Sequence, residues 1–160
     1  MKTKLPEIVR VARVGVTTIN GMVAAPVKLA VGKDEVAVLL AVRFKIDDMS
    51  GGVNDATLRW CIYRKSEGDP PEGSLITQDI QDNDDIIAGG GFYAVLVTSG
   101  AVFGTLTEDF VFPYPVVLVR PCQVLFETSY VGIQCGMYLY YLRQKIGDDD
   151  LTKLLVKDHA

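Results

Sequence analysis

Residues 35–47, EVAVLLAVRFKID, constrain the fold more than any other part of the chain, because hydrophobicity alternates along them. Every second residue is apolar: Val36, Val38, Leu40, Val42, Phe44 and Ile46. A helix would need apolar residues three and four positions apart, and the β-branched content of the run also opposes a helix. We therefore expect a long strand with these side chains in a core. The intervening residues turn basic only at Arg43, so the second face is expected to be covered in part.

Strand-like runs recur along the rest of the chain. They lie at residues 8–19, 27–31, 56–65, 74–80, 92–98, 103–112, 116–120, 123–127 and 133–143. Turn residues separate them, such as Pro113-Tyr114-Pro115, and the triple glycine at 89–91 is expected to form a hinge or bulge. Strands at a spacing of roughly 8–12 residues are typical of a sandwich or barrel. The sequence predicts an all-β protein, an antiparallel β-sandwich of jelly-roll type with a short C-terminal helix.

The last strand-like run has two different faces. One face is apolar and consists of Ile133, Cys135, Met137, Leu139 and Tyr141. The other consists of Gln134, Gly136, Tyr138, Tyr140 and Leu142. Two tyrosines and a leucine pointing outward would leave an exposed aromatic patch, unless another surface of this chain or of a partner covers them.

A helix is predicted at residues 147–157. Asp148 can cap the first turn, and the acidic residues that follow lie at the positive end of the helix dipole. Leu151, Leu154 and Leu155 recur at helical spacing and form one apolar stripe. Because about ten residues are too few to stay helical alone in water, we expect this segment to dock onto something, such as a neighbouring subunit.

The length of 160 residues predicts one domain, 1–160, in which residues 1–6 are expected to be flexible. The longest apolar run is much shorter than the roughly 20 residues of a membrane span, and the N-terminus has no apolar segment of a signal peptide. Cys61, Cys122 and Cys135 lie in strand-like runs without CxxC spacing, so all three are expected to be reduced core thiols.

The net charge of −4 argues against a protein that coats nucleic acid through a broad basic face. Positive charge gathers only near the N-terminus, at Lys2, Lys4, Arg10 and Arg13. These residues could make a weak contact with phosphates, although charges near a terminus are more often simply solvated.

No residue set indicates a reaction. The only histidine, His159, is next to the end of the chain, which argues against histidine-based catalysis and histidine-rich zinc sites. Glu108 and Glu127 would be the pair to consider for glycoside hydrolysis, but carboxylates on the wet face of a sheet are far commoner. The acidic turn at 81–85 lacks the glycine and the twelfth-position glutamate of a calcium loop. The sequence therefore predicts neither an enzyme nor a cofactor or metal.

Aromatic residues suggest a second class of function, a ligand- or glycan-binding module. Trp60 alternates with Leu58 and Ile62, so we expect it in the core rather than on a sugar-binding surface. Tyr130, Tyr138 and Tyr140 are better candidates for a ligand surface, but a subunit interface explains them equally well.

The C-terminal part of the chain resembles a known family. A long apolar strand, YLYYLRQKI, is followed by GDDD and by the amphipathic TKLLVKDHA. This ending is similar to that of small single jelly-roll coat proteins of viruses, over about the last thirty residues. Many such coat proteins carry a long basic N-terminal arm for the genome, whereas this chain has only four basic residues there. The resemblance thus implies a coat, decorating or outer-shell subunit, and a non-viral assembly also stays open.

We accordingly expect a structural subunit that assembles with copies of itself, and with other structural proteins in some shells, into a symmetric oligomer. The expected interface residues are Tyr130, Tyr138, Tyr140, Leu142, Leu151, Leu154 and Leu155. The expected location is the virion for a viral protein and otherwise the cytoplasm. The alternative is a ligand- or glycan-binding β-sandwich module.

Overall fold

The computed structural model describes residues 8–48, 56–64, 85–94, 106–119, 121–128, 131–150 and 152–153. Its strands are β1 (Arg10–Thr17), β2 (Gly21–Pro26), β3 (Glu35–Asp48), β4 (Ala56–Tyr63), β5 (Ile86–Ala94), β6 (Leu106–Leu118), β7 (Gln123–Thr128) and β8 (Gln134–Lys145). A short helical segment occupies residues 148–150 and 152–153. The all-β prediction is confirmed.

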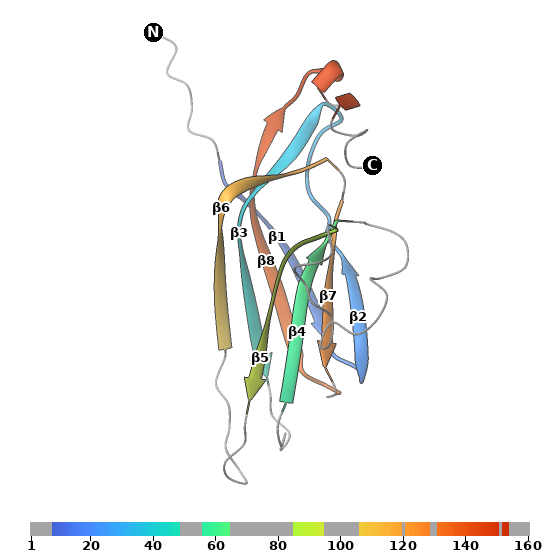
Figure 1. The fold of residues 1–160 in the computed structure, drawn as a ribbon, viewed down its shortest axis with the longest axis vertical. Helices are drawn as coiled ribbons and strands as arrows, with labels where there is room; N and C mark the ends of the chain where they lie inside the picture. The colour runs from blue at the N-terminus through green and yellow to red at the C-terminus, as the bar shows by residue number, and fades with distance from the viewer. Residues whose placement is uncertain are drawn as a thin grey trace.

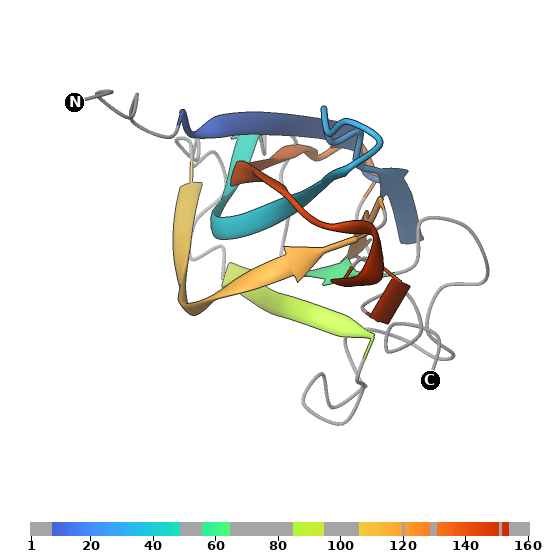
Figure 2. The same cartoon turned by 90° about the horizontal axis from the view of Figure 1, so that it is seen from above.

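The strands form two antiparallel sheets of four, in the orders β1-β8-β3-β6 and β2-β7-β4-β5. The two sheets face each other as layers (Figure 1 and, from above, Figure 2). The first four strands pair with the last four in reverse order: β1 with β8, β2 with β7, β3 with β6 and β4 with β5. Pairing of β3 with β8 and of β4 with β7 completes each sheet. The predicted antiparallel β-sandwich is therefore confirmed.

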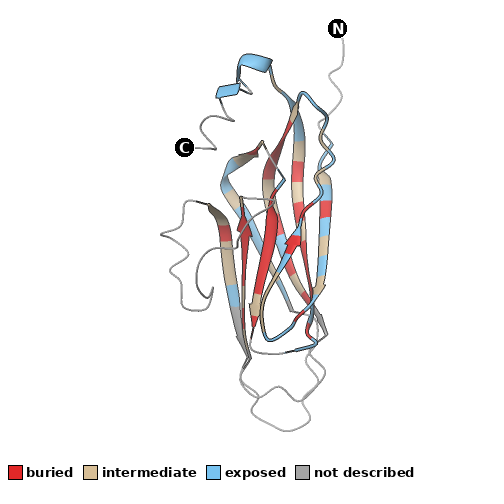
Figure 3. Cartoon of the chain, turned by 90° about the vertical axis from the view of Figure 1, so that its right-hand side faces the viewer, coloured by how far each residue is buried: buried red, intermediate tan, exposed pale blue. Residues whose placement is uncertain are grey.

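The core lies between the sheets, where the buried positions of facing strands meet (Figure 3). At its centre the ring of Phe44 on β3 stacks on Trp60 of β4, with the ring centroids 6.0 Å apart. The ring of Phe126 on β7 packs against Phe44 at the same centroid distance. Leu58, Trp60 and Ile62 are at most 2% exposed, as the alternation along β4 predicts. Trp60 is thus a core residue, and its indole Nε1 donates a hydrogen bond of 3.2 Å to the Glu108 carboxylate.

In β3 the side chains do not alternate strictly between the two sides of the sheet. Its register with both neighbours shifts between Leu39 and Ala41, so Leu40 is the extra residue of a β-bulge. The residues that point into the core are Ala37, Leu39, Val42, Phe44 and Ile46. The predicted inward face is therefore correct after the bulge and wrong before it, because one inserted residue moves Val36 and Val38 to the other side of the sheet.

The two strands predicted on either side of Pro113-Tyr114-Pro115 are one strand, β6. Its pairing with β3 jumps from Val111 to Val116, and the strand bends sharply at this irregularity (Figure 2). Proline has no N–H to donate to a sheet, which confines it to bulges and edge strands. Because β6 is the edge strand of its sheet, the prolines bend it without ending it.

The strand predicted at residues 27–31 is displaced. The structure has β2 immediately before it, starting at Gly21, whose φ of 116° lies in the left-handed region that favours glycine. Beyond Pro26 the chain leaves the sheet, although Leu29 and Val31 still pack against the core. Pro26 is the last residue of β2, and β2 is an edge strand of its sheet, where a missing N–H is tolerated.

The triple glycine at 89–91 is neither a hinge nor a bulge before a strand, because it lies inside β5. Gly90 faces the Trp60 indole, and a Cβ at this position would lie 3.0 Å from three indole atoms. A Cβ at Gly91 would lie 2.9 Å from the Leu58 carbonyl oxygen. The glycines therefore let β5 approach β4 and the tryptophan closely.

Several predictions fall outside the described residues. They concern the strand at 74–80, the basic residues Lys2 and Lys4, His159, the interface residues Tyr130, Leu151, Leu154 and Leu155, and the last part of the helix at 147–157. In the described part of that helix, the Thr152 hydroxyl donates a hydrogen bond of 2.9 Å to the Asp148 carbonyl oxygen. Within the described ranges, no helix is long and apolar enough to cross a membrane.

Candidate functional site

The candidate site is the outer face of the β1-β8-β3-β6 sheet, which we call the open face. Strand register aligns its side chains in rows that cross all four strands. The apolar row consists of Val11, Tyr140, Ala41 and Val111. The charged row consists of Arg13, Tyr138, Arg43 and Asp109. A third row, with two glycines, consists of Gly15, Gly136, Lys45 and Thr107.

Local sequence explains why these residues face outward. Successive side chains of a strand point to opposite sides of a sheet, so the core positions of β1 and β8 leave the alternate residues outside. In β3 the bulge at Leu40 sets which residues align with Tyr140 and Tyr138. The apolar row is accessible at both ends, where Val11 is 42% and Val111 is 73% exposed.

Electrostatic contacts organise the charged row. The Arg43 guanidinium donates two hydrogen bonds to the Asp109 carboxylate, at 2.6 and 2.8 Å. The hydrogen bond and the positive charge of Arg43 lower the pKa of Asp109, and the same contact raises the pKa of Arg43. The Arg13 guanidinium carbon lies 5.6 Å from the centre of the Tyr138 ring, within the range of a cation–π contact. The charged row thus contains one ion pair and one cation–π contact.

A shallow hollow of about 180 Å³ opens on this face between β8, β3 and β6. Tyr140, Ala41, Arg43, Asp109 and Val111 contribute to its lining. It contains an aromatic ring, a carboxylate and a guanidinium beside a small side chain. This arrangement can accept an apolar or aromatic group from another molecule, but it contains no nucleophile paired with a base.

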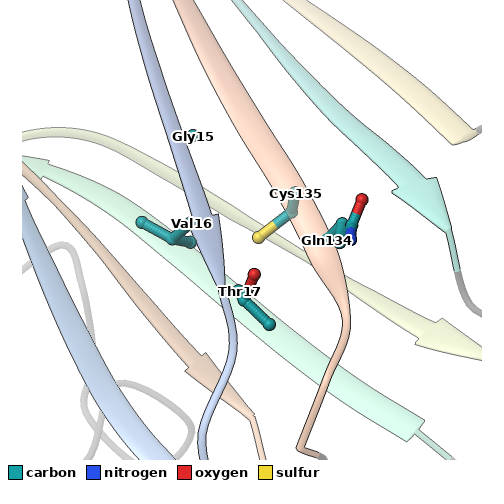
Figure 4. A pocket seen from close by; sticks show the side chains of 5 residues that line it. All are labelled: Gly15, Val16, Thr17, Gln134 and Cys135. Atoms are coloured by element: carbon teal, nitrogen blue, oxygen red, sulfur yellow. The ribbon is translucent and has the colours of Figure 1, made fainter.

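A second hollow, of about 260 Å³, lies where β1 and β8 pair near the other end of the sheet (Figure 4). Its lining includes Gly15, Thr17 and Cys135, and it is widely open. Cys135 is only 3% exposed, because its side chain belongs to the core cluster. The hollow exists in part because Gly15 on β1 has no side chain to fill it. Its lining brings no reactive set of groups together.

The outer face of the β2-β7-β4-β5 sheet, which we call the covered face, is different. Cys61, Tyr63 and Leu125 form a second buried cluster there, with exposures of 0%, 4% and 0%. Burial raises the pKa of the Cys61 thiol to about 12, and burial in the main core does the same for Cys122. The three cysteines are buried and form no disulfide with one another, as the sequence predicts. This face is therefore not available to a partner at these residues.

The carboxylates considered for glycoside hydrolysis do not converge. Glu108 accepts a hydrogen bond from Trp60 between the sheets. Glu127 pairs in register with Arg59 and Met22, on the side of β7 that points away from the core. The two carboxyl groups thus lie on opposite sides of the second sheet and cannot flank one substrate bond.

The structure brings three of the predicted interface residues onto one face. Tyr138, Tyr140 and Leu142 are half-buried on the open face, and Leu142 aligns with Val38 of β3. The sequence analysis missed Val11 and Val111, and it did not connect the Arg43 and Asp109 side chains. The alternating pattern of β1 and of β6 could have indicated that Val11 and Val111 point outward. Only the order of the strands in the sheet shows that these residues share a row.

Two of the predicted N-terminal basic residues lie in β1, and their contact with phosphates stays a prediction. Arg13 is engaged with the Tyr138 ring, and Arg10 is half-buried. Asp109 also places a negative charge in the charged row. Neither the comparison with protein-family models nor the comparison with curated protein sequences finds a match to this chain.

Proposed function

We propose that this chain is a jelly-roll structural subunit that assembles with copies of itself into a closed oligomer or shell. The support for the jelly roll is the order of pairing, in which strands one to four meet strands eight to five. This order corresponds to one long hairpin folded over into two sheets. A jelly roll has eight strands in two sheets and contains two Greek keys, and a folded hairpin of this kind generates both.

One observation carries the proposal of assembly: the open face exposes an apolar row on a sheet whose other side is fully packed. Val111 is 73% and Val11 is 42% exposed, with Tyr140 between them. A contiguous apolar patch on a soluble chain marks an interaction site. Closed symmetric homo-oligomers are the commonest way in which soluble chains cover such a patch.

The proposed class is a viral coat or virion surface protein. Its supports are the pairing order and the resemblance of the C-terminal strand and acidic helix start to those of small coat proteins. The net charge of −4 favours a decorating or outer-shell role over direct packaging of a genome. Under this proposal the subunit performs no chemistry and works at the virion surface.

Light scattering after size exclusion, followed by negative-stain microscopy, tests the proposal. The wild-type chain is expected to elute as an assembly of uniform particles. Tyr140→Asp places a charge in the apolar row and is expected to yield a folded 17.5 kDa monomer. Tyr140→Phe keeps the ring and is the matched control, expected to assemble normally. Assembly of Tyr140→Asp into wild-type particles would show that this face is not an interface.

A ligand- or glycan-binding module is the second candidate. The observation that favours it is the hollow of about 180 Å³ beside Tyr140, where a carboxylate and an aromatic ring lie together. Sugar recognition combines such a ring with a few polar groups. Binding of the monomeric chain to a glycan array, abolished by Tyr140→Asp and by Asp109→Asn, would favour this candidate over assembly.

A further inference from the structure

We propose that the open face binds the open face of a second copy about a two-fold axis that runs parallel to the strands, between β8 and β3. This inference rests on the proposed function and names the contact through which the subunit first pairs. It is argued from how the rows of one copy meet those of another, because an isologous interface must be complementary to itself.

This axis places each strand opposite a different strand of the second copy. Each row of one copy lies opposite the same row of the other copy. By the sheet order, β1 faces β6 and β8 faces β3 across the interface. Packed sheets keep their strand directions within about 30° of each other, which this arrangement satisfies. The match can therefore be checked row by row from the register alone.

Charges are complementary in this arrangement. Arg13 of one copy lies opposite Asp109 of the other, and the same pair forms a second time by symmetry. Asp109 already binds Arg43, but a carboxylate has about four lone-pair sites and can accept from a second guanidinium. The Tyr138 ring lies opposite Arg43 of the second copy, again a cation and an aromatic face.

Sizes are complementary as well. In the apolar row Val11 meets Val111, and the large Tyr140 meets the small Ala41 beside the hollow. The third row sets Gly15 against Thr107 and Gly136 against Lys45 in the same way. In these rows Tyr140 and Lys45 thus each face a small residue.

A two-fold axis perpendicular to the strands does not give this result. It would set every strand against itself, so the charged row would meet itself or a neighbouring row of the same strands. Arg13 would then face Arg13, Val11 or Gly15, and none of these residues supplies a counter-charge. Like charges in close contact across an interface oppose association.

A cross-linking experiment on the full chain tests the geometry. Val11→Cys and Val111→Cys are combined in one chain and treated with a bismaleimide that spans about 10 Å, the separation of packed sheets. We expect a covalent dimer on a denaturing gel for the double variant, and none for either single variant or for the wild type, whose thiols are buried. Equal dimer yield from the Val11→Cys single variant would overturn the proposal, because it requires β1 to face β1.

A charge exchange provides a second, independent test. Arg13→Asp and Asp109→Arg are each expected to weaken pairing at least tenfold, measured by sedimentation velocity with circular dichroism as the folding control. An equimolar mixture of the two variants is expected to restore it, because in the mixed dimer both contacts join opposite charges. A mixture that associates no better than its components, with both chains folded, would overturn the proposal.

The outcomes separate this inference from the proposed function. A wild-type chain that stays at 17.5 kDa at all concentrations contradicts the structural-subunit proposal itself. A wild-type chain that assembles, but shows neither the cross-link of the double variant nor rescue in the mixture, contradicts only the two-fold contact.

Discussion

The two outer faces of the sandwich contain similar apolar side chains but have opposite exposure. On the covered face Cys61 and Leu125 are 0% exposed, whereas on the open face Val11 and Val111 are 42% and 73% exposed. Both sets lie on strands whose other side packs into the same core. Apolar residues on both sides of a strand therefore do not by themselves identify an interface. The interface candidate is the part of the open face that the chain leaves exposed, since Val36 and Val38 at one end of that face are buried within the chain.

The difference also separates stability from association. Side chains of the covered face contribute to folding of the single chain, because their burial needs no partner. Those of the open face gain burial only when another molecule arrives. Substitutions on the two faces should consequently change different measurements, and this contrast can be tested in order of decreasing effect.

The largest expected effect is the truncation of Leu125, since this residue is fully buried in the covered face. Leu125→Ala should lower the free energy of unfolding by about 2–5 kcal/mol, the range for a leucine whose loss leaves a cavity. Val111→Ala, the matched truncation on the open face, should change it by no more than about 0.5 kcal/mol. Urea unfolding of both variants in a Tyr140→Asp background, where pairing is removed, makes the comparison. Equal losses would contradict the assignment of the two faces.

A smaller effect is expected at the glycines. Gly90→Ala would place a Cβ 3.0 Å from the Trp60 indole, which is 1% exposed and stacks with Phe44 in the core. Overpacking of this kind costs about 1–3 kcal/mol. Gly15→Ala on the open face meets its nearest atom at 3.9 Å and should fold as well as the wild type. Thermal unfolding followed by tryptophan fluorescence measures the midpoint temperature of both variants. An unchanged midpoint for Gly90→Ala would show that the space between β5 and the Trp60 indole can accept a methyl group.

The smallest effect is expected for the exposed ion pair. Asp109→Asn removes the carboxylate that Arg43 binds, but side-chain exposures of 46% and 53% leave the pair open to solvent and salt. Because the folded-state pKa of Asp109 is lowered, its contribution to stability is present above the ordinary aspartate pKa of about 4 and disappears as the pH falls through the folded value. The variant should therefore be slightly less stable than the wild type at pH 7, and the difference should vanish once the pH is below the folded-state pKa of Asp109. A difference that persists at low pH would point to another cause.

Sequence alone predicts the fold class and the facing of β4 and β8, since alternation and turn residues act locally. The bulge at Leu40 is not visible in the run around it, because Val36 and Leu39 are equally apolar and either could face inward. The bend of β6 at its prolines depends on the position of β6 at a sheet edge, which is a property of topology. Local pattern thus predicts that most of these segments are strands, while their exact bounds, their order in the sheets and their register depend on the fold.

The candidate site shows the same limit. Alternation along β8 identifies Tyr138 and Tyr140 as outward residues, and the structure places them there. Arg13 and Asp109 are almost a hundred residues apart in the chain and lie in one row only because β1 and β6 flank the same two strands. A row across four strands requires strand order and register together, and neither follows from one sequence.

Sedimentation equilibrium of the purified wild-type chain over a wide concentration range tests the central claim most directly, since it reports mass without labels or variants. If the open face is covered by another copy, the mass will be at least twice 17.5 kDa and will fall to the monomer value when Tyr140 is replaced by aspartate. A single species of 17.5 kDa at every concentration would contradict the account.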